Sequence, residues 1–213
     1  MLKHLGAMAA GLVIAIVLPV AAMAQTVTTP PWLTNGNNGL MFDVQATNDL
    51  TVTNITDAVL SANPGGSTFE LYSRPGTYVG NAASSAGWEL ISTGSATATG
   101  ANRLSFTLNA AIPAGQTRAF YLRGVNASVG YVNGTQSSPW ASDANLAITE
   151  GGGLTDFFGG ITNSPRALGG SITYTPGIEV EAIPTMSEWA MILLGLTLAG
   201  GAALYIQRRR LEV

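Results

Sequence analysis

Few side chains of this sequence could carry chemistry, and most of them are carboxylates. The 213-residue chain has no cysteine and a single histidine, His4, close to its start. Downstream of that residue, neither a Ser-His-Asp or Cys-His nucleophile system nor a zinc site with imidazole or thiolate ligands can be built. Glu70 and Glu89 remain as a pair for glycoside hydrolysis, which needs one acid and one base or nucleophile. Both lie in alternating, strand-like sequence where an outward glutamate is routine, so we favour two solvated side chains.

Three other carboxylates, Asp143, Glu150 and Asp156, would suit calcium, because that ion prefers oxygen ligands. No D-x-D-x-D run or other dense ligand loop accompanies them. The sequence therefore predicts no metal site and no cofactor.

The stretch GGGLTDFFGG (151–160) is rich in glycine but lacks the Gly-Lys-Ser/Thr element of a phosphate-binding loop. It also does not lie between a strand and a helix. We expect a long flexible loop with Phe157 and Phe158 tucked beneath it.

Aromatic residues offer a different kind of site. Trp140 and Tyr131 fall in the loop-like stretch GYVNGTQSSPWASDAN, which also holds Asn133 and Asp143. Flat rings stack on the C–H faces of sugars, while neighbouring amides and carboxylates bind the hydroxyls. The four residues are therefore a candidate glycan-binding site. The alternative, which we favour, is that these rings fill or cap the core.

Short strands must position these side chains, because runs with two-residue alternation recur along the middle of the chain. In RLSFTLN (103–109) apolar and polar residues alternate without exception. Comparable runs lie at 40–46, 50–60, 67–73, 87–93, 117–125, 145–150 and 169–176. Turn-forming clusters separate them, and no segment here has apolar residues at helical spacing over three turns. The pattern predicts an all-β fold, an antiparallel β-sandwich (jelly-roll-like) of about eight or nine strands, with residues 25–39 as a leader or loop.

Targeting segments flank this domain. The first 24 residues contain a basic residue, then an apolar run, then small residues at Ala22 and Ala24, which is the pattern of a signal peptide. Cleavage by signal peptidase would leave Gln25 as the new N-terminus; an uncleaved signal anchor or a buried helix is the alternative. The predicted segments are 1–24 (signal peptide), 25–177 (exported sandwich domain), 178–182 (linker) and 183–213 (tail).

The exported part is acidic. Its five arginines stand against ten acidic residues between Asp43 and Glu181, and it has no lysine, so its net charge is near −5. Nucleic acids and anionic membrane surfaces both require a basic face. The composition therefore argues against nucleic acid as a partner.

The tail contains an apolar segment that ends in a basic cluster. Ala190 to Ile206 are 17 uncharged, mostly apolar residues, at the lower end of the range for a membrane-spanning helix. Arg208, Arg209 and Arg210 follow, and such a cluster favours the cytoplasmic side. With the export signal, this predicts a single C-terminal transmembrane helix in the inner membrane and the domain on its periplasmic side.

The residues before the apolar segment carry a resemblance. IPTMSEW, an apolar span and an arginine cluster together resemble the IPTL-CTERM sorting signal of Gram-negative bacteria. The residues that match the pattern of that family are Ile183, Pro184, Thr185 and Trp189. Met186 stands where leucine is usual and Ala190 where glycine is usual; both changes are mild, because they alter volume and polarity little. Pro184 also disfavours helix at this site, and an extended segment is what a protease or transpeptidase groove binds.

The resemblance implies that the chemistry belongs to a partner, an exosortase-like membrane enzyme with a cysteine nucleophile. On this interpretation the protein is a non-enzymatic surface protein, recognised at IPTM and transferred to the cell surface or extracellular matrix. Its sandwich domain, which we assign to no named family, would be structural, adhesive or ligand-binding. The alternative is a surface-tethered module that binds extracellular polysaccharide, or a carboxylate-dependent glycosidase.

Overall fold

The computed structural model describes residues 22–136, 139–177 and 186–211. These fall into two units, the β-domain (residues 22–177) and the C-terminal helix α1 (Met186–Leu211), which are treated separately.

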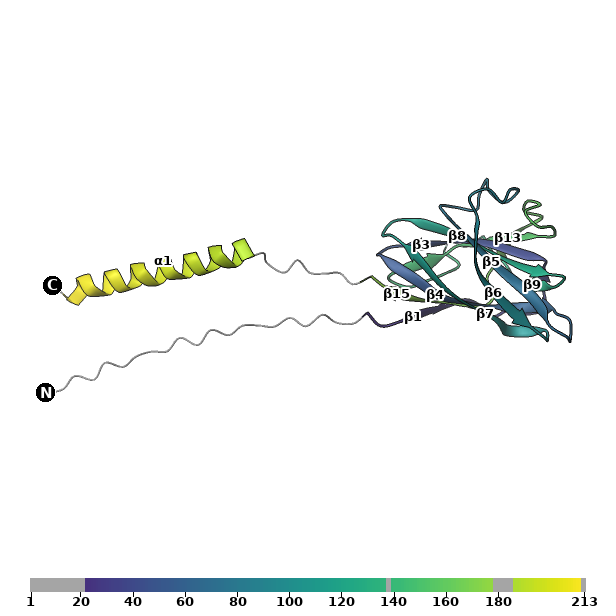
Figure 1. Ribbon diagram of the computed structural model, residues 1–213, viewed down its shortest axis with the longest axis horizontal. Helices are drawn as coiled ribbons and strands as arrows, with labels where there is room; N and C mark the ends of the chain where they lie inside the picture. The colour runs from purple at the N-terminus through teal and green to yellow at the C-terminus, as the bar shows by residue number, and fades with distance from the viewer. Residues whose placement is uncertain (1–21, 137–138, 178–185, 212–213) are drawn as a thin grey trace. The chain divides into compact units, whose positions relative to one another are not determined.

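The β-domain consists of two sheets, shown as arrows in Figure 1. The strands of the smaller sheet, in hydrogen-bonded order, are β1 (Gln25–Thr28), β15 (Ser171–Pro176), β4 (Leu50–Ser61), β9 (Ser128–Gly130) and β2 (Gly36–Asn37), with β7 (Gly100–Ile112) also beside β4. Those of the larger sheet are β10 (Val132–Asn133), β14 (Asn163–Ala167), β13 (Gly151–Leu154), β3 (Gly39–Ala46), β8 (Thr117–Val125), β5 (Ser67–Pro75) and β6 (Glu89–Ala96), with β12 (Leu146–Ile148) beside β3 and β11 (Ala141–Ser142) beside β12. Every pairing between these strands is antiparallel.

One hydrophobic core lies between the two sheets. Phe69 and Leu71 of β5 share a cluster of buried side chains with Leu104 and Phe106 of β7, so both sheets contribute to it. Burial alternates residue by residue along most of β7, because the other face of that strand meets solvent. The predicted antiparallel sandwich is therefore confirmed.

The structure contains more strands than the eight or nine predicted, with fifteen among the described residues. The alternating runs correspond to β3 to β8, β12 and β15. The others are short strands of two to five residues, in which no periodicity can be recognised. One of them, β1, corrects the expectation that residues 25–39 begin as a leader or loop, because Gln25–Thr28 pair with β15.

A second, mainly aromatic cluster covers the outer face of the larger sheet. Met41 of β3 and Tyr121 of β8 point away from the main core and pack with Ala82, Leu154 and Phe158. Other side chains packed against them are Tyr72, Tyr78, Trp88 and Ile161. The middle of β3 is consequently buried on both faces, although its sequence alternates.

The first part of residues 151–160 is a strand and not the loop that we expected, whereas residues 155–160 form turns and loop. Gly151–Leu154 are β13, a fully buried strand between β3 and β14. Glycine is required here because the strands approach closely: a Cβ atom on Gly151 would lie 1.7 Å from the carbonyl oxygen of Met41. Phe158 is buried as expected, whereas Phe157 is 47% exposed.

Substitution at this strand gives a first prediction. We expect Gly151→Ala to lower the free energy of unfolding by about 3 kcal/mol, since the added methyl group forces β13 away from β3. Gly65→Ala is the matched control, because a Cβ atom there meets nothing within 4 Å. Urea unfolding of both variants measures the difference, and equal stabilities would contradict the close approach.

The two ends of the β-domain leave it at the same place. Gln25 at the start of β1 lies opposite Tyr174, and Pro176 at the end of β15 lies opposite Leu50, where β4 begins. The twelve residues of β4 then extend about 36 Å to Ser61. We call the end with Gln25, Leu50 and Pro176 the tail end, and the end with Ser61 the loop end.

Helix α1 is long and apolar. Its segment Trp189–Leu211 has 23 residues, and the most apolar stretch of 18 residues within it has a mean hydropathy of 1.8, which is sufficient in length and composition to cross a membrane. Its large apolar side chains are exposed all around the helix, which is typical of a helix in apolar surroundings. Arg208, Arg209 and Arg210 occupy the last turn, where cations complement the helix dipole.

Candidate functional site

The predicted glycan-site residues next to β10 are engaged within the fold. Tyr131 is only 4% exposed, so its ring offers no open face to a sugar. The guanidinium of Arg166 lies 5.1 Å from the centre of that ring. Asn133 is exposed, and its Oδ1 accepts a hydrogen bond of 2.8 Å from the amide of Asn35.

The other two predicted residues, Trp140 and Asp143, flank β11. The indole N–H of Trp140 donates to the carbonyl of Leu168 at 3.0 Å. Asp143 Oδ1 accepts the backbone N–H groups of Asn145 and Leu146 at 2.8 and 3.0 Å. Among the described residues, no hydrogen bond or ring contact joins Trp140 or Asp143 to Tyr131 or Asn133.

Asp143 belongs to a hydrogen-bond network at the tail end. The hydroxyl of Tyr174 lies 2.6 Å from Asp143 Oδ2 and 2.6 Å from Gln25 Oε1. Burial acts to raise the pKa of Asp143, but the hydrogen bonds from Tyr174 and the backbone outweigh it and lower that pKa. Burial, followed by the bond to Asp143, raises the pKa of Tyr174 to about 12. The network ties the first residue of β1 to β15, which gives Asp143 a structural role.

The register of β5 and β6 separates the two glutamates considered for glycoside hydrolysis. Glu70 lies opposite Thr93 and Glu89 opposite Ser73. Because Glu70 and Ser73 are three residues apart on β5, their side chains point to opposite faces of the sheet, and so do the two carboxylates. A glycosidase pair must flank one bond from a shared site, so Glu70 and Glu89 are not placed to act as such a pair.

The carboxylates considered for calcium also lie apart. Glu150 accepts the backbone N–H groups of Thr135 and Gln136 at 2.6 and 2.8 Å, and Asp143 holds the tail-end network. Asp156 lines a pocket with Ser61 at the loop end. Within the described ranges, no three His, Cys, Asp or Glu residues form a group that could hold a metal ion.

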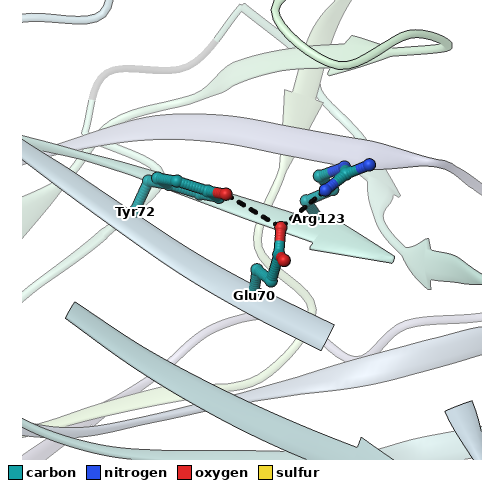
Figure 2. Close-up of polar contacts among 3 residues, drawn as sticks. All are labelled: Glu70, Tyr72 and Arg123. Carbon is teal, nitrogen blue, oxygen red and sulfur yellow. Dashed lines mark hydrogen bonds and ion pairs between the residues drawn. The ribbon is translucent and has the colours of Figure 1, made fainter. Parts of the chain in front are cut away.

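A polar cluster that the sequence did not indicate lies on the outer face of the larger sheet. Figure 2 shows the Glu70 carboxylate of β5 between Tyr72 of the same strand and Arg123 of β8. One oxygen, Glu70 Oε2, accepts both the Tyr72 hydroxyl at 2.9 Å and the Arg123 guanidinium at 2.6 Å. Burial, and next the hydrogen bond to Glu70, raises the pKa of Tyr72. The ion pair between Glu70 and Arg123 fixes the position of the Arg123 guanidinium.

Arg123 also contacts the aromatic cluster. Its guanidinium carbon lies 4.1 Å from the centre of the Phe157 ring, close enough for a strong cation–π contact. Phe157 in turn packs on Phe158 at 4.7 Å and on Tyr72 at 5.6 Å between ring centres. Glu70, Arg123 and Phe157 thereby form one connected group.

This group borders a pocket of about 450 Å³ at the loop end. Four parts of the chain line it: the residue before β3, the end of β4, β8 with the turn after it, and the segment after β13. The lining residues are Asn38, Ser61, Tyr121, Arg123, Gly124, Asn126, Ala127, Ser128, Thr155, Asp156 and Phe157. Such a set could not be recognised from spacing, because strand pairing alone brings these segments together.

The tail presents a different candidate site, built on α1. Trp189 near its start and Tyr205 near its end are 49% and 60% exposed, and the guanidinium of Arg209 lies 5.5 Å from the ring of Tyr205. Amphipathic rings at both ends of an apolar helix are typical of a span whose ends lie at the two membrane interfaces.

A comparison with protein families addresses this segment directly. Residues 181–210 match the family model of the IPTL-CTERM motif. The tail is thus similar to the IPTL-CTERM motif. The match does not extend into the β-domain, which has no assigned family, and a search of curated proteins gives no match for the chain.

Within the IPTL-CTERM motif, Met186 is the first residue of α1 and Trp189 lies in its first turn. Ile183, Pro184 and Thr185 lie outside the described residues, as do the predicted linker (178–182) and most of the predicted signal peptide. Ala22 and Ala24, predicted to precede the signal peptidase cut, are described and come directly before β1.

Proposed function

We propose that this is an exported surface protein whose IPTM-x-x-W signal is recognised and processed by an exosortase-like membrane enzyme. The match of residues 181–210 to the IPTL-CTERM motif carries the proposal. The helix supports it, because an apolar segment long enough to span a membrane ends in three arginines within that same match. The protein is then cargo, and the covalent chemistry belongs to its partner.

The proposed route begins with export in a Gram-negative cell. Signal peptidase would cut after Ala24, and α1 would then hold the protein in the inner membrane with the β-domain on the periplasmic side and Arg208, Arg209 and Arg210 in the cytoplasm. Processing would release the β-domain to the cell surface or extracellular matrix. The tail end is consistent with this route, because Gln25, which follows the predicted signal peptide in sequence, and Pro176, which precedes the tail in sequence, lie at the same end of the β-domain.

Mass spectrometry of the C-terminus tests the proposal. In cells that contain the enzyme we expect the mature chain to lack Arg208–Arg210, and in cells without it we expect the tail to be intact. Trp189→Ala should prevent processing because it removes a signature residue of the motif, whereas Tyr205→Ala, another exposed aromatic of α1, should not. A tail that is intact through Arg210 in both strains would make α1 a permanent anchor and refute the sorting step.

A further inference from the structure

The loop-end pocket is placed where a surface protein would meet a ligand. Ser61, at the end of β4, lines it, whereas the chain enters and leaves the β-domain at the other end of that strand. Its volume of about 450 Å³ lies in the range of roughly 300–1,000 Å³ typical of small-molecule sites.

The charges around the pocket favour a neutral ligand. The charged residues that line it are Arg123 and Asp156. Arg123 is already paired with Glu70 at 2.6 Å, so its positive charge is largely compensated, and Asp156 adds a negative charge at the rim. An anionic ligand would meet no net positive potential here.

The hydrogen-bonding groups favour a ligand rich in hydroxyls. Asn126 lines the pocket with an exposed amide, which offers both donors and an acceptor. Arg123 adds donors, Asp156 adds acceptors, and Ser61 contributes a hydroxyl that can serve as either. A hydroxyl group is itself both donor and acceptor, so a polyhydroxylated molecule can satisfy this mixture whereas an apolar molecule cannot.

The flat surface beside these groups completes the site. The guanidinium of Arg123 and the ring of Phe157 stack at 4.1 Å, and Phe157 remains 47% exposed. Contacts with Phe158 and Tyr121 hold the Phe157 ring in place, so little conformational entropy is lost when a ligand packs on it. An aromatic plane next to mixed donors and acceptors matches the two surfaces of a sugar ring, its C–H face and its hydroxyls.

We infer that the loop-end pocket binds a neutral saccharide, with Phe157 as the packing surface and Arg123, Asn126 and Asp156 as the hydroxyl partners. This site is distinct from Tyr131, Asn133, Trp140 and Asp143, whose groups are engaged within the fold.

Titration calorimetry of the full chain tests the inference, in a zwitterionic detergent without a sugar headgroup. The probes are cellotetraose, maltotetraose and chitotetraose, with a sulfated tetrasaccharide as the anionic comparison. We expect at least one neutral probe to bind, the sulfated probe to bind at least tenfold more weakly, and Phe157→Ala to weaken neutral binding at least tenfold. Absence of binding by all three neutral probes would overturn the inference, and so would tighter binding of the sulfated probe.

Matched variants separate a pocket from general damage to the fold. Asn126→Gly removes the amide but retains a residue suited to its φ of 53°, and Asn102→Gly makes the same change at a residue with the same φ that does not line the pocket. Leu90→Ala removes another side chain that is 47% exposed. We expect Asn126→Gly to weaken binding at least fivefold and both controls to stay within twofold of wild type. Binding that survives Phe157→Ala and Asn126→Gly but is lost in Trp140→Ala would place the site elsewhere. None of these results depends on whether the tail is cut.

Discussion

At pH 7 the Asp57→Asn variant is expected to be more stable than the wild-type protein by roughly 4 kcal/mol, and near pH 4 most of this advantage should disappear. Asp57 lies on β4 and is 0% exposed. Its Oδ1 accepts the N–H of Gly169 at 3.3 Å, whereas its buried Oδ2 has no hydrogen-bond partner among the described residues. A buried carboxylate without a cation beside it is costly, so the carboxyl remains protonated in the folded state over a wide pH range.

The direction of the pH effect follows from the two pKa values. Burial, opposed only by backbone hydrogen bonds from Ala58 and Gly169, raises the pKa of Asp57 from 3.8 to about 8. The folded state therefore binds a proton that the unfolded state releases. The stability that this proton contributes is complete below about pH 4 and is lost as the pH rises towards 8, by about 1.4 kcal/mol per pH unit. Between pH 4 and pH 7 this amounts to roughly 4 kcal/mol, and asparagine, which does not ionise, avoids the loss.

Urea unfolding at half-unit steps from pH 4 to pH 8.5 measures this effect. The wild-type curve should fall through this range and the Asp57→Asn curve should be much flatter. A small slope should remain near the acid end, because burial also raises the pKa of Asp43. Asp156→Asn, a change at an exposed carboxylate, serves as the control and should follow the wild-type curve. Parallel curves for wild type and Asp57→Asn would show that Asp57 ionises freely in the folded protein.

Asp57 also illustrates what alternation in a sequence can and cannot show. The pattern of β7 predicted its buried face correctly because one side of that strand meets solvent. In β3 the alternation does not separate a buried face from an exposed one, since the aromatic cluster covers Met41 on the outer face of the larger sheet as well. Asp57 lies in a run rich in β-branched residues, and nothing in that run indicates that its carboxyl is buried without a cation. Whether the outer face of a strand is also buried depends on which distant segments of the chain cover it, and the sequence of the strand does not show this.

The short strands were missed for a related physical reason. β13 consists of three glycines and a leucine, a composition typical of a loop, yet it is a fully buried strand. Its glycines are needed because Gly151 packs against the backbone of Met41, and that proximity depends on the register of β3. A local pattern shows which conformations a glycine permits, but it does not show which neighbour makes glycine necessary.

The candidate sites differ in the same way. The tail could be recognised from sequence, because the IPTL-CTERM motif is contiguous and its signal depends on order and position along the chain. The loop-end pocket could not, because Arg123, Asn126 and Phe157 come together only through the pairing of β8 with β3 and β5 and through the segment after β13. The aromatic residues chosen from loop-like sequence, Tyr131 and Trp140, were those most noticeable in sequence, but one is buried and the other bonds to Leu168.

The second large effect concerns α1. We expect Leu198→Arg to release the protein from the membrane fraction of cells that lack the processing enzyme. Leu198 lies near the middle of the apolar segment Trp189–Leu211, where an arginine costs about 3 kcal/mol relative to an apolar residue. A cost of that size shifts the insertion equilibrium by more than about 100-fold. The new side chain is ten residues, or about 15 Å along the helix, from Arg208, which is too far for it to reach the interface by extending its stem.

Extraction of the membranes with alkaline carbonate measures this release, with the exported protein followed in the soluble and membrane fractions. Gln207→Arg is the matched control: it introduces the same side chain into the same helix but next to Arg208, where a further cation lies at the interface and should leave retention unchanged. The comparison separates the position of the charge from its presence. If Leu198→Arg and Gln207→Arg are both retained like the wild-type protein, α1 is not what holds this protein in the membrane, because no bilayer-spanning helix of this composition would tolerate both equally.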